Sequence, residues 1–209
     1  MYPPPIYAVD DPATVEAMLS AVGLGSLVTS GPDGFTVTHL PLVYDPTAKV
    51  LRGHVSAQNP HAHTGDGPAL VIFQGAEAYV TPAFYPSKAE HGRVAPTWNY
   101  ECLHVHGPLR WVSDPTWLRA NIEAVTDRFE AGRAEPWRVD DAPADWTDKL
   151  IGRIVGLEIA CARVDVRRKM SQDKRDPDRL GVIAGLAASP DPADQRVAAA
   201  MAALEKDRA

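Results

Sequence analysis

The spacing of hydrophobic residues changes several times along the chain, and each spacing predicts a type of element. After Asp11-Pro12, a pair typical of a helix start, apolar residues recur at positions 15, 18, 19 and 22, as on one face of a short helix. From residue 24 to about residue 112, Val, Ile, Thr and aromatic runs alternate with Gly, Pro and Asp turns. This pattern is typical of antiparallel strands, so the sequence predicts a mainly β chain of the α+β class.

The first two expected strands are separated by one tight turn. Residues 27–29 and 35–37 flank Ser30-Gly-Pro-Asp-Gly34 and are expected to form a hairpin. In the second strand, the apolar residues shift from odd positions to even ones, which predicts a β-bulge near residues 38–39. Further strands are expected at 50–57, at 69–73 with both faces buried, and at 94–112 as a barrel wall that also faces a partner subunit.

Helices are expected to interrupt and then follow these strands. Asp114-Pro115 predicts a second helix that extends to Phe129, and a shorter helical turn carries Trp146 and Leu150. Strand texture returns over 154–166, and a last helix is expected over 192–208. Because the helices do not alternate with the strands, a Rossmann-type arrangement is excluded. We expect a single domain over 1–209 with a C-terminal helical extension over about 176–209.

Composition and charge narrow the classes of function. The chain has 209 residues and a net charge of −6, which opposes a protein that works mainly by wrapping nucleic acid. No apolar run is long enough to span a membrane, and the first residues do not resemble a signal peptide, so a soluble cytoplasmic protein is expected. Cys102 and Cys161 lie in apolar stretches without metal-binding or redox spacing, and we expect both to be buried, reduced thiols.

Common catalytic and nucleotide-binding signatures are absent from the sequence. There is no GxGxxG, Walker, HExxH or GxSxG pattern. All seven histidines lie between positions 39 and 106, which raises the possibility of a metal or haem site. Their spacing lacks nearby Cys or carboxylate partners, so no metal site is expected, and haem handling is kept only as a third alternative.

Two polar segments are candidates for ligand binding. In His54-Val-Ser56-Ala-Gln58-Asn59, a polar strand face leads into hydroxyl and amide donors, which together with turn amides can hold a phosphate. The same residues suit an ordinary exposed strand end, which the spacing alone favours. In Thr97-Trp-Asn-Tyr100, two aromatic residues alternate with two hydrogen-bonding residues, as a flat conjugated ring requires. Composition alone favours a core position for Trp98 and Tyr100.

The chain carries a series of short motifs in a characteristic order and spacing. They are Met1-Tyr2, Thr38-His-Leu-Pro-Leu42, Gly53-His54, Asn59-Pro60, Phe73-Gln-Gly75, Tyr79-Val80, Tyr85-Pro-Ser-Lys88, Pro96-Thr-Trp-Asn-Tyr100, Ile154-Val-Gly-Leu-Glu158 and Lys169-Met-Ser-Gln172. Over nearly the whole chain, this series resembles the PaiB-type proteins, which are described as FMN-binding negative transcriptional regulators. The most specific blocks are PTWNY and YPSK.

The resemblance implies a fold and a cofactor. The fold would be an antiparallel Greek-key split β-barrel with flanking helices, of the FMN-binding split-barrel type, related to flavin reductases and pyridoxamine-phosphate oxidases. The protein would be a homodimer with FMN at the subunit interface, and the phosphate loop would lie at Ser56 to Asn59. The implied cofactor-binding residues are Thr38, His39, His54, Ser56, Asn59, Lys88, Thr97, Trp98 and Asn99.

The chain departs from the family pattern at four positions. Phe84 and Arg168 stand where the family has Trp, Ala95 where it has a second Val, and Asp173 where it has Asn. A carboxylate next to a phosphate would repel it, so the C-terminal block is not expected to hold the phosphate.

Two functions follow from the resemblance and remain open. The first is a homodimeric, FMN-binding transcriptional regulator. The alternative is a flavin-dependent oxidoreductase that uses FMN and NAD(P)H on an unknown small molecule, with catalytic residues unknown. The acidic balance of the chain and the lack of a DNA-reading helix give direct DNA binding little support.

Overall fold

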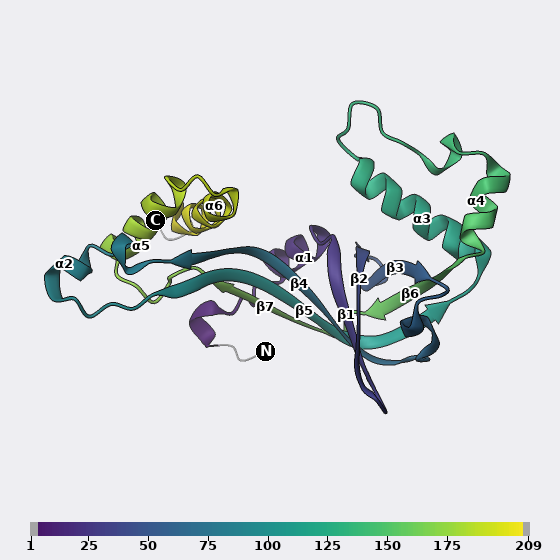
Figure 1. Cartoon of the computed structure of the whole chain (residues 1–209), viewed down its shortest axis with the longest axis horizontal. Helices are drawn as coiled ribbons and strands as arrows, with labels where there is room; N and C mark the ends of the chain where they lie inside the picture. Colours follow the sequence, from purple (N-terminus) through teal and green to yellow (C-terminus); the bar gives the residue numbers. More distant parts are fainter. Residues whose placement is uncertain (1–3, 207–209) are drawn as a thin grey trace. The chain divides into compact units, whose positions relative to one another are not determined.

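The structure, a computed structural model, describes residues 4–206 (Figure 1). Met1-Tyr2 and the expected end of the last helix at residue 208 lie outside the described residues. The strands are β1 (Leu24–Gly31), β2 (Gly34–Asp45), β3 (Val50–Ser56), β4 (Gly67–Val80), β5 (Thr97–Val112), β6 (Ile154–Ala160) and β7 (Arg163–Lys169). The α-helices are α1 (Pro12–Ser20), α2 (Ser87–His91), α3 (Pro115–Glu130), α4 (Ala144–Ile151), α5 (Asp176–Ala187) and α6 (Pro192–Lys206). Short 3₁₀ helices are η1 (Pro5–Tyr7), η2 (Pro60–His63), η3 (Pro82–Phe84) and η4 (Val139–Asp141).

The strands form one sheet that closes on itself. Its order is β4-β1-β2-β3-β6-β5-β7, and β4 also pairs with β5, so six strands complete a ring and β7 continues from β5. The pairings of β1 with β2 and β4, of β2 with β3, and of β6 with β3 and β5 are antiparallel. Closure removes most of the exposed strand edges. The predicted fold class, a mainly β antiparallel barrel with flanking helices, is confirmed.

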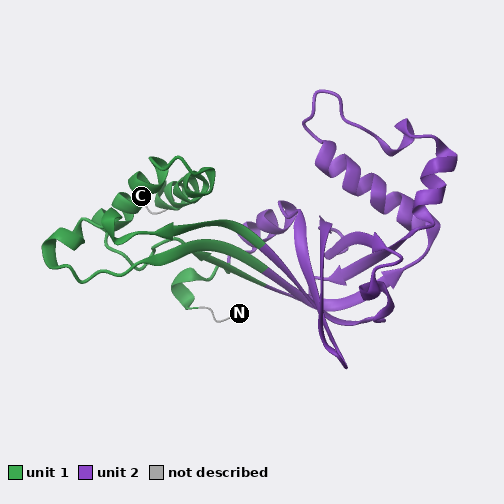
Figure 2. Cartoon of the chain, in the orientation of Figure 1, with its two compact units in different colours: residues 1–10, 74–103, 165–209 green, residues 11–73, 104–164 purple. Residues whose placement is uncertain are grey.

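The chain forms two compact units, each built from separate segments of sequence (Figure 2). Unit 1 comprises residues 1–10, 74–103 and 165–209, and unit 2 comprises residues 11–73 and 104–164. The helices α5 and α6 both belong to unit 1. The expectation of a single domain with a C-terminal helical extension stays a prediction.

The core of unit 2 is the inner face of its strands, covered on one outer side by α3. Leu27, Leu42, Leu51 and Leu157 are fully buried on the inner face. On the outer side, Gly156 of β6 leaves room for α3, because a Cβ at this position would lie 2.2 Å from Trp117 Cζ3. A glycine is therefore required where the helix approaches the sheet.

The core of unit 1 lies between α5, α6 and the part of β4 that belongs to this unit. Val80, Val182, Leu186 and Val197 have no exposed surface. Gly185 on α5 contacts the ring of Phe84, which lies 2.3 Å from the position of an added Cβ. The family's Trp is thus replaced by a smaller ring that packs directly on a helix backbone.

The predicted hairpin of β1 and β2 is confirmed, but the predicted bulge is wrong. The register continues without interruption from Leu24 opposite Pro41 to Gly31 opposite Gly34. Leu40 is buried on the inner face, whereas Phe35 and Val37 are 80% and 53% exposed on the outer face. The change of parity therefore marks apolar residues on the outside of the sheet and not a change of face.

The predicted helix starts are confirmed by their caps. The Asp11 side chain accepts a hydrogen bond from Thr14 N at 2.8 Å, and Asp114 accepts one from Trp117 N at 2.7 Å. The strand expected over 154–166 divides into β6 and β7. Within β4, residues 69, 71 and 73 are buried, but Leu70 and Ile72 are only partly covered, so two-sided burial was overestimated.

Cys102 and Cys161 form no disulfide within residues 4–206, and both are only partly buried. Burial raises the pKa of Cys161 to about 11 and also raises the pKa of Cys102, so both are protonated near neutral pH. Within residues 4–206, no helix is long and apolar enough to cross a membrane.

Candidate functional site

The turn that follows β3 in unit 2 is held by its own hydrogen bonds. Ser56 ends the strand, its carbonyl accepts from Asn59 N at 2.9 Å, and its Oγ accepts from Gln58 N at 3.2 Å. Ala57 N donates to the carbonyl of Arg153 at 2.8 Å. The three backbone N–H groups at 57, 58 and 59 are therefore used within the protein. A ligand at this turn would bind to side-chain donors.

A buried histidine fixes the same turn to the barrel. His61 has no exposed surface, and Asn59 Oδ1 accepts from its backbone N at 2.9 Å. The His61 ring bonds to Thr38 Oγ1 through Nδ1 at 3.0 Å and to Thr29 Oγ1 through Nε2 at 2.9 Å. Asn59 Nδ2 also donates to Thr38 Oγ1, at 3.3 Å. Two of the predicted site residues, Thr38 and Asn59, are thus in direct contact.

The His61 ring is neutral in this network. Burial lowers its pKa below the ordinary 6.5. A neutral imidazole has one donor and one acceptor nitrogen, so each nitrogen can serve one threonine hydroxyl. The edge of the ring also contacts Trp111, with ring centroids 5.9 Å apart. The network is therefore fully hydrogen bonded without any charge.

The other two predicted histidines lie elsewhere in unit 2. His39 is on the outer face of β2, where its Nδ1 bonds to Ser26 Oγ at 2.9 Å. His54 is on the face of β3 that α3 covers, and its Nδ1 lies 3.4 Å from Asn121 Nδ2. Burial also lowers the pKa of His54. Because Thr38 and His39 are neighbours on one strand, their side chains point to opposite faces of the sheet.

In unit 1, the predicted residues Thr97 and Trp98 share a lysine partner. Lys169 Nζ donates to Thr97 Oγ1 and to the carbonyl of Trp98, the latter at 2.6 Å. The Trp98 ring is 52% exposed and makes an edge contact with Tyr79, with centroids 6.1 Å apart. Burial lowers the pKa of Lys169 despite the opposing effect of Asp173.

Asn99 occupies the core position that composition assigned to the neighbouring aromatic residues. It has no exposed surface, and its Nδ2 donates to Ser171 Oγ at 3.0 Å and contacts Met201 Sδ at 3.3 Å. Trp98 is half exposed and Tyr100 only partly buried. The core interpretation of these two rings was therefore wrong, because α6 covers the opposite face of β5.

Lys88, the last of the predicted cofactor-binding residues, also lies in unit 1, as do the four positions that depart from the family pattern. Lys88 is exposed on α2. Arg168 forms an ion pair with Glu101, and Asp173 forms one with Lys174 at 2.6 Å. Asp173 also accepts a hydrogen bond from Tyr7, and burial and this carboxylate together raise the pKa of Tyr7 to about 12. Arg168 and Asp173 thus each form an ion pair with a residue of the same unit.

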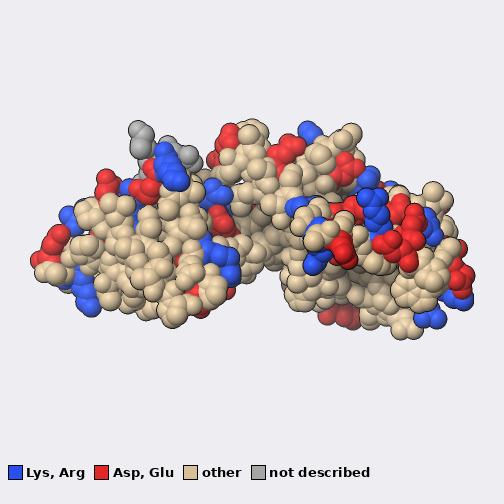
Figure 3. All heavy atoms as spheres, turned by 90° about the horizontal axis from the view of Figure 1, so that it is seen from above, with Lys and Arg blue, Asp and Glu red and all other residues tan. Residues whose placement is uncertain are grey.

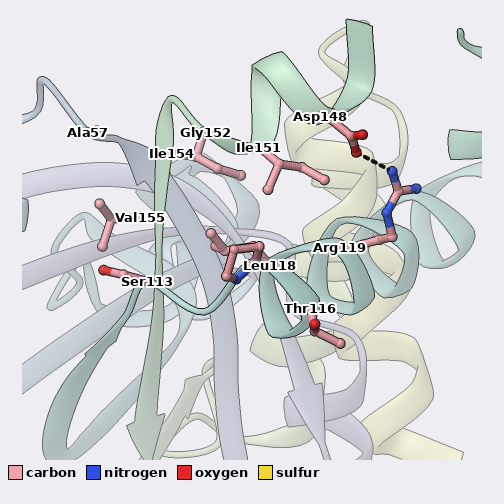
Figure 4. Close-up of a pocket in the computed structure, with 11 residues that line it drawn as sticks. Ala57, Ser113, Thr116, Leu118, Arg119, Asp148, Ile151, Gly152, Ile154 and Val155 are labelled. Atoms are coloured by element: carbon pink, nitrogen blue, oxygen red, sulfur yellow. Dashed lines mark hydrogen bonds and ion pairs between the residues drawn. The ribbon is translucent and has the colours of Figure 1, made fainter. Parts of the chain in front are cut away.

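A cavity of about 580 Å³ adjoins the Ser56–Asn59 turn in unit 2 (Figure 4). Ala57 and Val155 lie at one end of it, and an ion pair of 2.8 Å between Arg119 and Asp148 lies at the other. Leucine and isoleucine side chains line most of the space between, and the volume is typical of small-molecule sites. Of the predicted phosphate loop, Ala57 lines this cavity, whereas Ser56 and Asn59 are not among its lining residues.

Charges of both signs are mixed on the surface. On the face shown in Figure 3, Lys and Arg side chains lie beside Asp and Glu side chains, without a continuous basic area. A surface that wraps nucleic acid needs clustered positive charge, which this face does not provide.

The antiparallel barrel is shared with solved flavoproteins. The flavocytochrome Anf3 from Azotobacter vinelandii superposes with a TM-score of 0.61 at 15% identity, over 83% of this chain and 75% of that one. The FAD and heme binding protein from Mycobacterium smegmatis also gives 0.61, at 16% identity, over 82% and 78%. Identities this low establish the fold alone.

The family follows from the sequence match. Residues 1–163 match the family described as "Putative FMN-binding domain", and the chain belongs to this family. Relatives include the Emericella nidulans protein AN0679, 34% identical over 71% of this chain and 73% of that one. Another is the protease synthase and sporulation protein PAI 2 of Bacillus subtilis, 25% identical over 96% of both chains. The predicted family is confirmed, and with it the cofactor FMN that the family is described as binding.

The sequence analysis missed three residues at the turn. The sequence analysis treats His61 only as one of the seven histidines considered for a metal or haem site, Thr29 only as part of a strand, and Arg153 not at all. The signal that could have found His61 is its position two residues after Asn59, where an Asn-Pro helix start brings the following side chain under the turn. Nothing local identifies Thr29, whose contact with His61 spans 32 residues.

Proposed function

We propose that this protein binds FMN as a homodimer and acts as a cytoplasmic regulatory protein. The observation that carries the proposal is the Ser56–Asn59 turn, which the neutral network around His61 holds rigidly beside a cavity in a chain of the FMN-binding family. The name of the relative PAI 2, a protease synthase and sporulation protein, favours a regulatory role.

The turn fits the phosphate end of FMN through side-chain donors. The Ser56 hydroxyl can donate, because it is used only as the acceptor for Gln58 N within the turn. Asn59 uses one amide hydrogen toward Thr38, so the second is available. Arg153 is exposed, and its backbone carbonyl accepts from Ala57 N, so its side chain starts at this turn and can supply a positive charge for a phosphate.

An apolar sheet face in unit 2 supports the homodimer. The registers of β1 with β2 and β4 place Val28, Val37 and Leu70 in one row on the outer face. Leu24 and Phe35 on the same face are 70% and 80% exposed. The polar pair of Ser26 and His39 separates Leu24 from the other residues. Exposed apolar residues grouped on one sheet face are typical of a protein interface, and a second copy of the chain would cover them.

The first experiment measures the visible spectrum and the mass of the purified protein during FMN titration. Flavin absorption near about 370 and 450 nm on a particle of about 45 kDa, twice the 22.6 kDa of one chain, is expected. Ser56→Ala combined with Asn59→Ala is expected to weaken the binding of FMN by about tenfold. The binding of riboflavin should weaken much less, because only FMN carries the phosphate. Equal losses for both ligands would place the phosphate elsewhere.

The alternative function is a flavin-dependent oxidoreductase that uses NAD(P)H. Bound FMN supplies hydride and electron transfer, and this chain would position the ring and exclude water. Bleaching of the bound flavin by NADH or NADPH, followed by reoxidation with an acceptor, would favour this alternative. A regulator that acts through a partner protein would show no such turnover, and one that binds an operator itself would do so with strong salt dependence.

A further inference from the structure

The cavity beside the Ser56–Asn59 turn in unit 2 has room for a ligand other than the FMN phosphate (Figure 4). The side chains that the FMN proposal uses at the turn, those of Ser56 and Asn59, do not line it. Its apolar walls come from the start of α3, the end of α4 and the start of β6, with Leu118, Ile151 and Ile154 among the lining residues. A volume of about 580 Å³ with such walls suits a small molecule that has a hydrophobic body.

The polar end of the cavity carries more negative than positive charge. Arg119 Nη2 lies 2.8 Å from Asp148 Oδ1, and Arg119 Nη1 lies 3.8 Å from a carboxylate oxygen of Glu123 and 3.8 Å from one of Asp140. Three carboxylates therefore share one guanidinium. An anionic ligand at this end would be repelled by these carboxylates, whereas a cationic ligand would be attracted.

Asp148 can accept a hydrogen bond from a ligand. Its side chain is 69% exposed, and Arg119 binds it through Oδ1, so Oδ2 can serve as an acceptor. Gly152, which lines the cavity, caps the C-terminal end of α4, where the helix dipole favours a positive charge. At the N-terminus of α3, where an anion would be favoured, the Asp114 carboxylate already accepts from Trp117 N.

The segments that form the cavity also hold the turn. Ala57, which lines the cavity, donates its backbone N–H to the carbonyl of Arg153 at 2.8 Å. Arg153 N in turn donates to the carbonyl of Leu150 in α4 at 2.9 Å, and its two neighbours in sequence, Gly152 and Ile154, both line the cavity. A ligand packed against α4, β6 and Ala57 would restrict the motion of these segments, so its binding is coupled to the order of the turn.

We propose that this cavity binds a small amine with a hydrophobic body, whose ammonium group pairs with Asp148, and that the bound amine stabilises the turn assigned to the FMN phosphate. The amine site stands on the cavity alone, whereas its effect on FMN rests on the proposed function. The amine and FMN then each increase the affinity of the protein for the other by the same factor. A regulatory protein could respond to a small molecule in this way.

The test is calorimetric titration of the full-length protein with phenethylamine and with hydrocinnamate, at neutral pH and constant ionic strength. The two probes have similar hydrophobic bodies and head groups of opposite charge. Saturable binding of phenethylamine is expected, at least about tenfold tighter than that of hydrocinnamate. Absence of saturable binding by the amine, or equal binding of both probes, overturns the proposal.

The variant Asp148→Asn tests the head-group contact, because it removes the charge and keeps the shape. It is expected to weaken phenethylamine by about tenfold. The matched control is Asp145→Asn, since Asp145 is also exposed on α4 and also paired, with Lys149 at 3.2 Å, but does not line the cavity. The control is expected to bind the amine like the unaltered protein. Equal binding by Asp148→Asn, or equal losses in both variants, overturns the assignment of Asp148.

Hydrogen exchange of the peptide that contains Ala57 and Asn59 measures the turn without FMN. Both backbone N–H groups are hydrogen bonded, and saturation with phenethylamine is expected to slow their exchange by about fivefold. The dissociation constant of FMN is expected to fall by a similar factor, and that of riboflavin, which lacks the phosphate, to change less. Unchanged exchange, or unchanged FMN affinity, overturns the coupling. If FMN does not bind at all, the proposed function fails, while calorimetry and hydrogen exchange still decide the amine site.

Discussion

One buried polar centre in each unit is held together in a different way. In unit 2, the turn at the candidate FMN site depends on neutral hydrogen bonds that converge on His61. In unit 1, the largely buried Arg179 is held by charge, through its ion pair with Glu205 between α5 and α6. The first centre contains no charged group, whereas the second depends on two opposite charges.

The difference decides what each centre loses when one member is removed. Loss of a member of a neutral network leaves unpaired hydrogen-bonding groups and a cavity. Loss of one member of an ion pair leaves an uncompensated charge. The predictions below test this contrast by measuring what each unit loses when its polar centre is removed.

The largest effect is expected from His61→Ala in unit 2. The substitution removes the hydrogen bond of His61 to the Thr29 hydroxyl and leaves the Thr38 hydroxyl only its contact with Asn59. It also opens a cavity where the ring was fully buried. We expect the free energy of unfolding to fall by about 4 kcal/mol, measured by urea denaturation. The exposed His39→Ala serves as the control and should cost less than about 0.5 kcal/mol. A similar small loss for His61→Ala would show that the turn does not depend on the ring.

A smaller loss is expected from Arg179→Met in unit 1. Arg179 is 7% exposed, and two of its nitrogens each lie 2.8 Å from an oxygen of Glu205, which joins α5 to α6. Removing one partner of a largely buried pair should lower the free energy of unfolding by about 2 to 3 kcal/mol. Arg179→Lys keeps the positive charge but lacks the two guanidinium nitrogens that bind Glu205 together. It should therefore recover only part of the lost free energy of unfolding. Full recovery by lysine would mean that charge alone matters.

The smallest effect is a dependence of stability on pH between about 7.5 and 5.5. Burial lowers the pKa of both His61 and His54 below 6.5. These histidines therefore bind protons more readily in the unfolded chain than in the folded chain. As a result, the free energy of unfolding falls as the pH drops below 6.5. Urea midpoints across this range should decline in the unaltered protein and decline less in His61→Gln. An equal decline would assign the titration to other groups.

Below this range, a carboxylate in unit 2 adds a second loss. Burial alone would raise the pKa of Glu158, but hydrogen bonds from Arg110 and Arg52 outweigh it and lower the pKa below 4.5. The stability contributed by these bonds is present above pH 4.5 and disappears as the pH falls through the lowered value. The histidine and carboxylate effects therefore occupy separate parts of the pH axis.

Parts of the fold could be predicted because their determinants are close in the sequence. Asp11 and Asp114 cap their helices through a backbone N–H three residues away, and the hairpin of β1 and β2 depends on one short turn. The bulge predicted from Phe35 and Val37 was wrong. A bulge and apolar residues on the outer sheet face both shift the apolar positions from odd to even, so the sequence pattern cannot distinguish them. Only the register with β1 distinguishes the two.

The sequence by itself determined the family, the mainly β class, the approximate positions of most elements and the polar residue types of the Ser56–Asn59 turn. The tertiary structure decided that His61 is buried beneath this turn, that Asn99 and not Trp98 enters the core, and that Asp148 borders a cavity. The physical reason is distance along the chain: His61 meets Thr29 across 32 residues, and Asn99 meets Ser171 across 72 and Met201 across 102. Burial arises from these long-range contacts, and no local pattern of residue types encodes which of them will form.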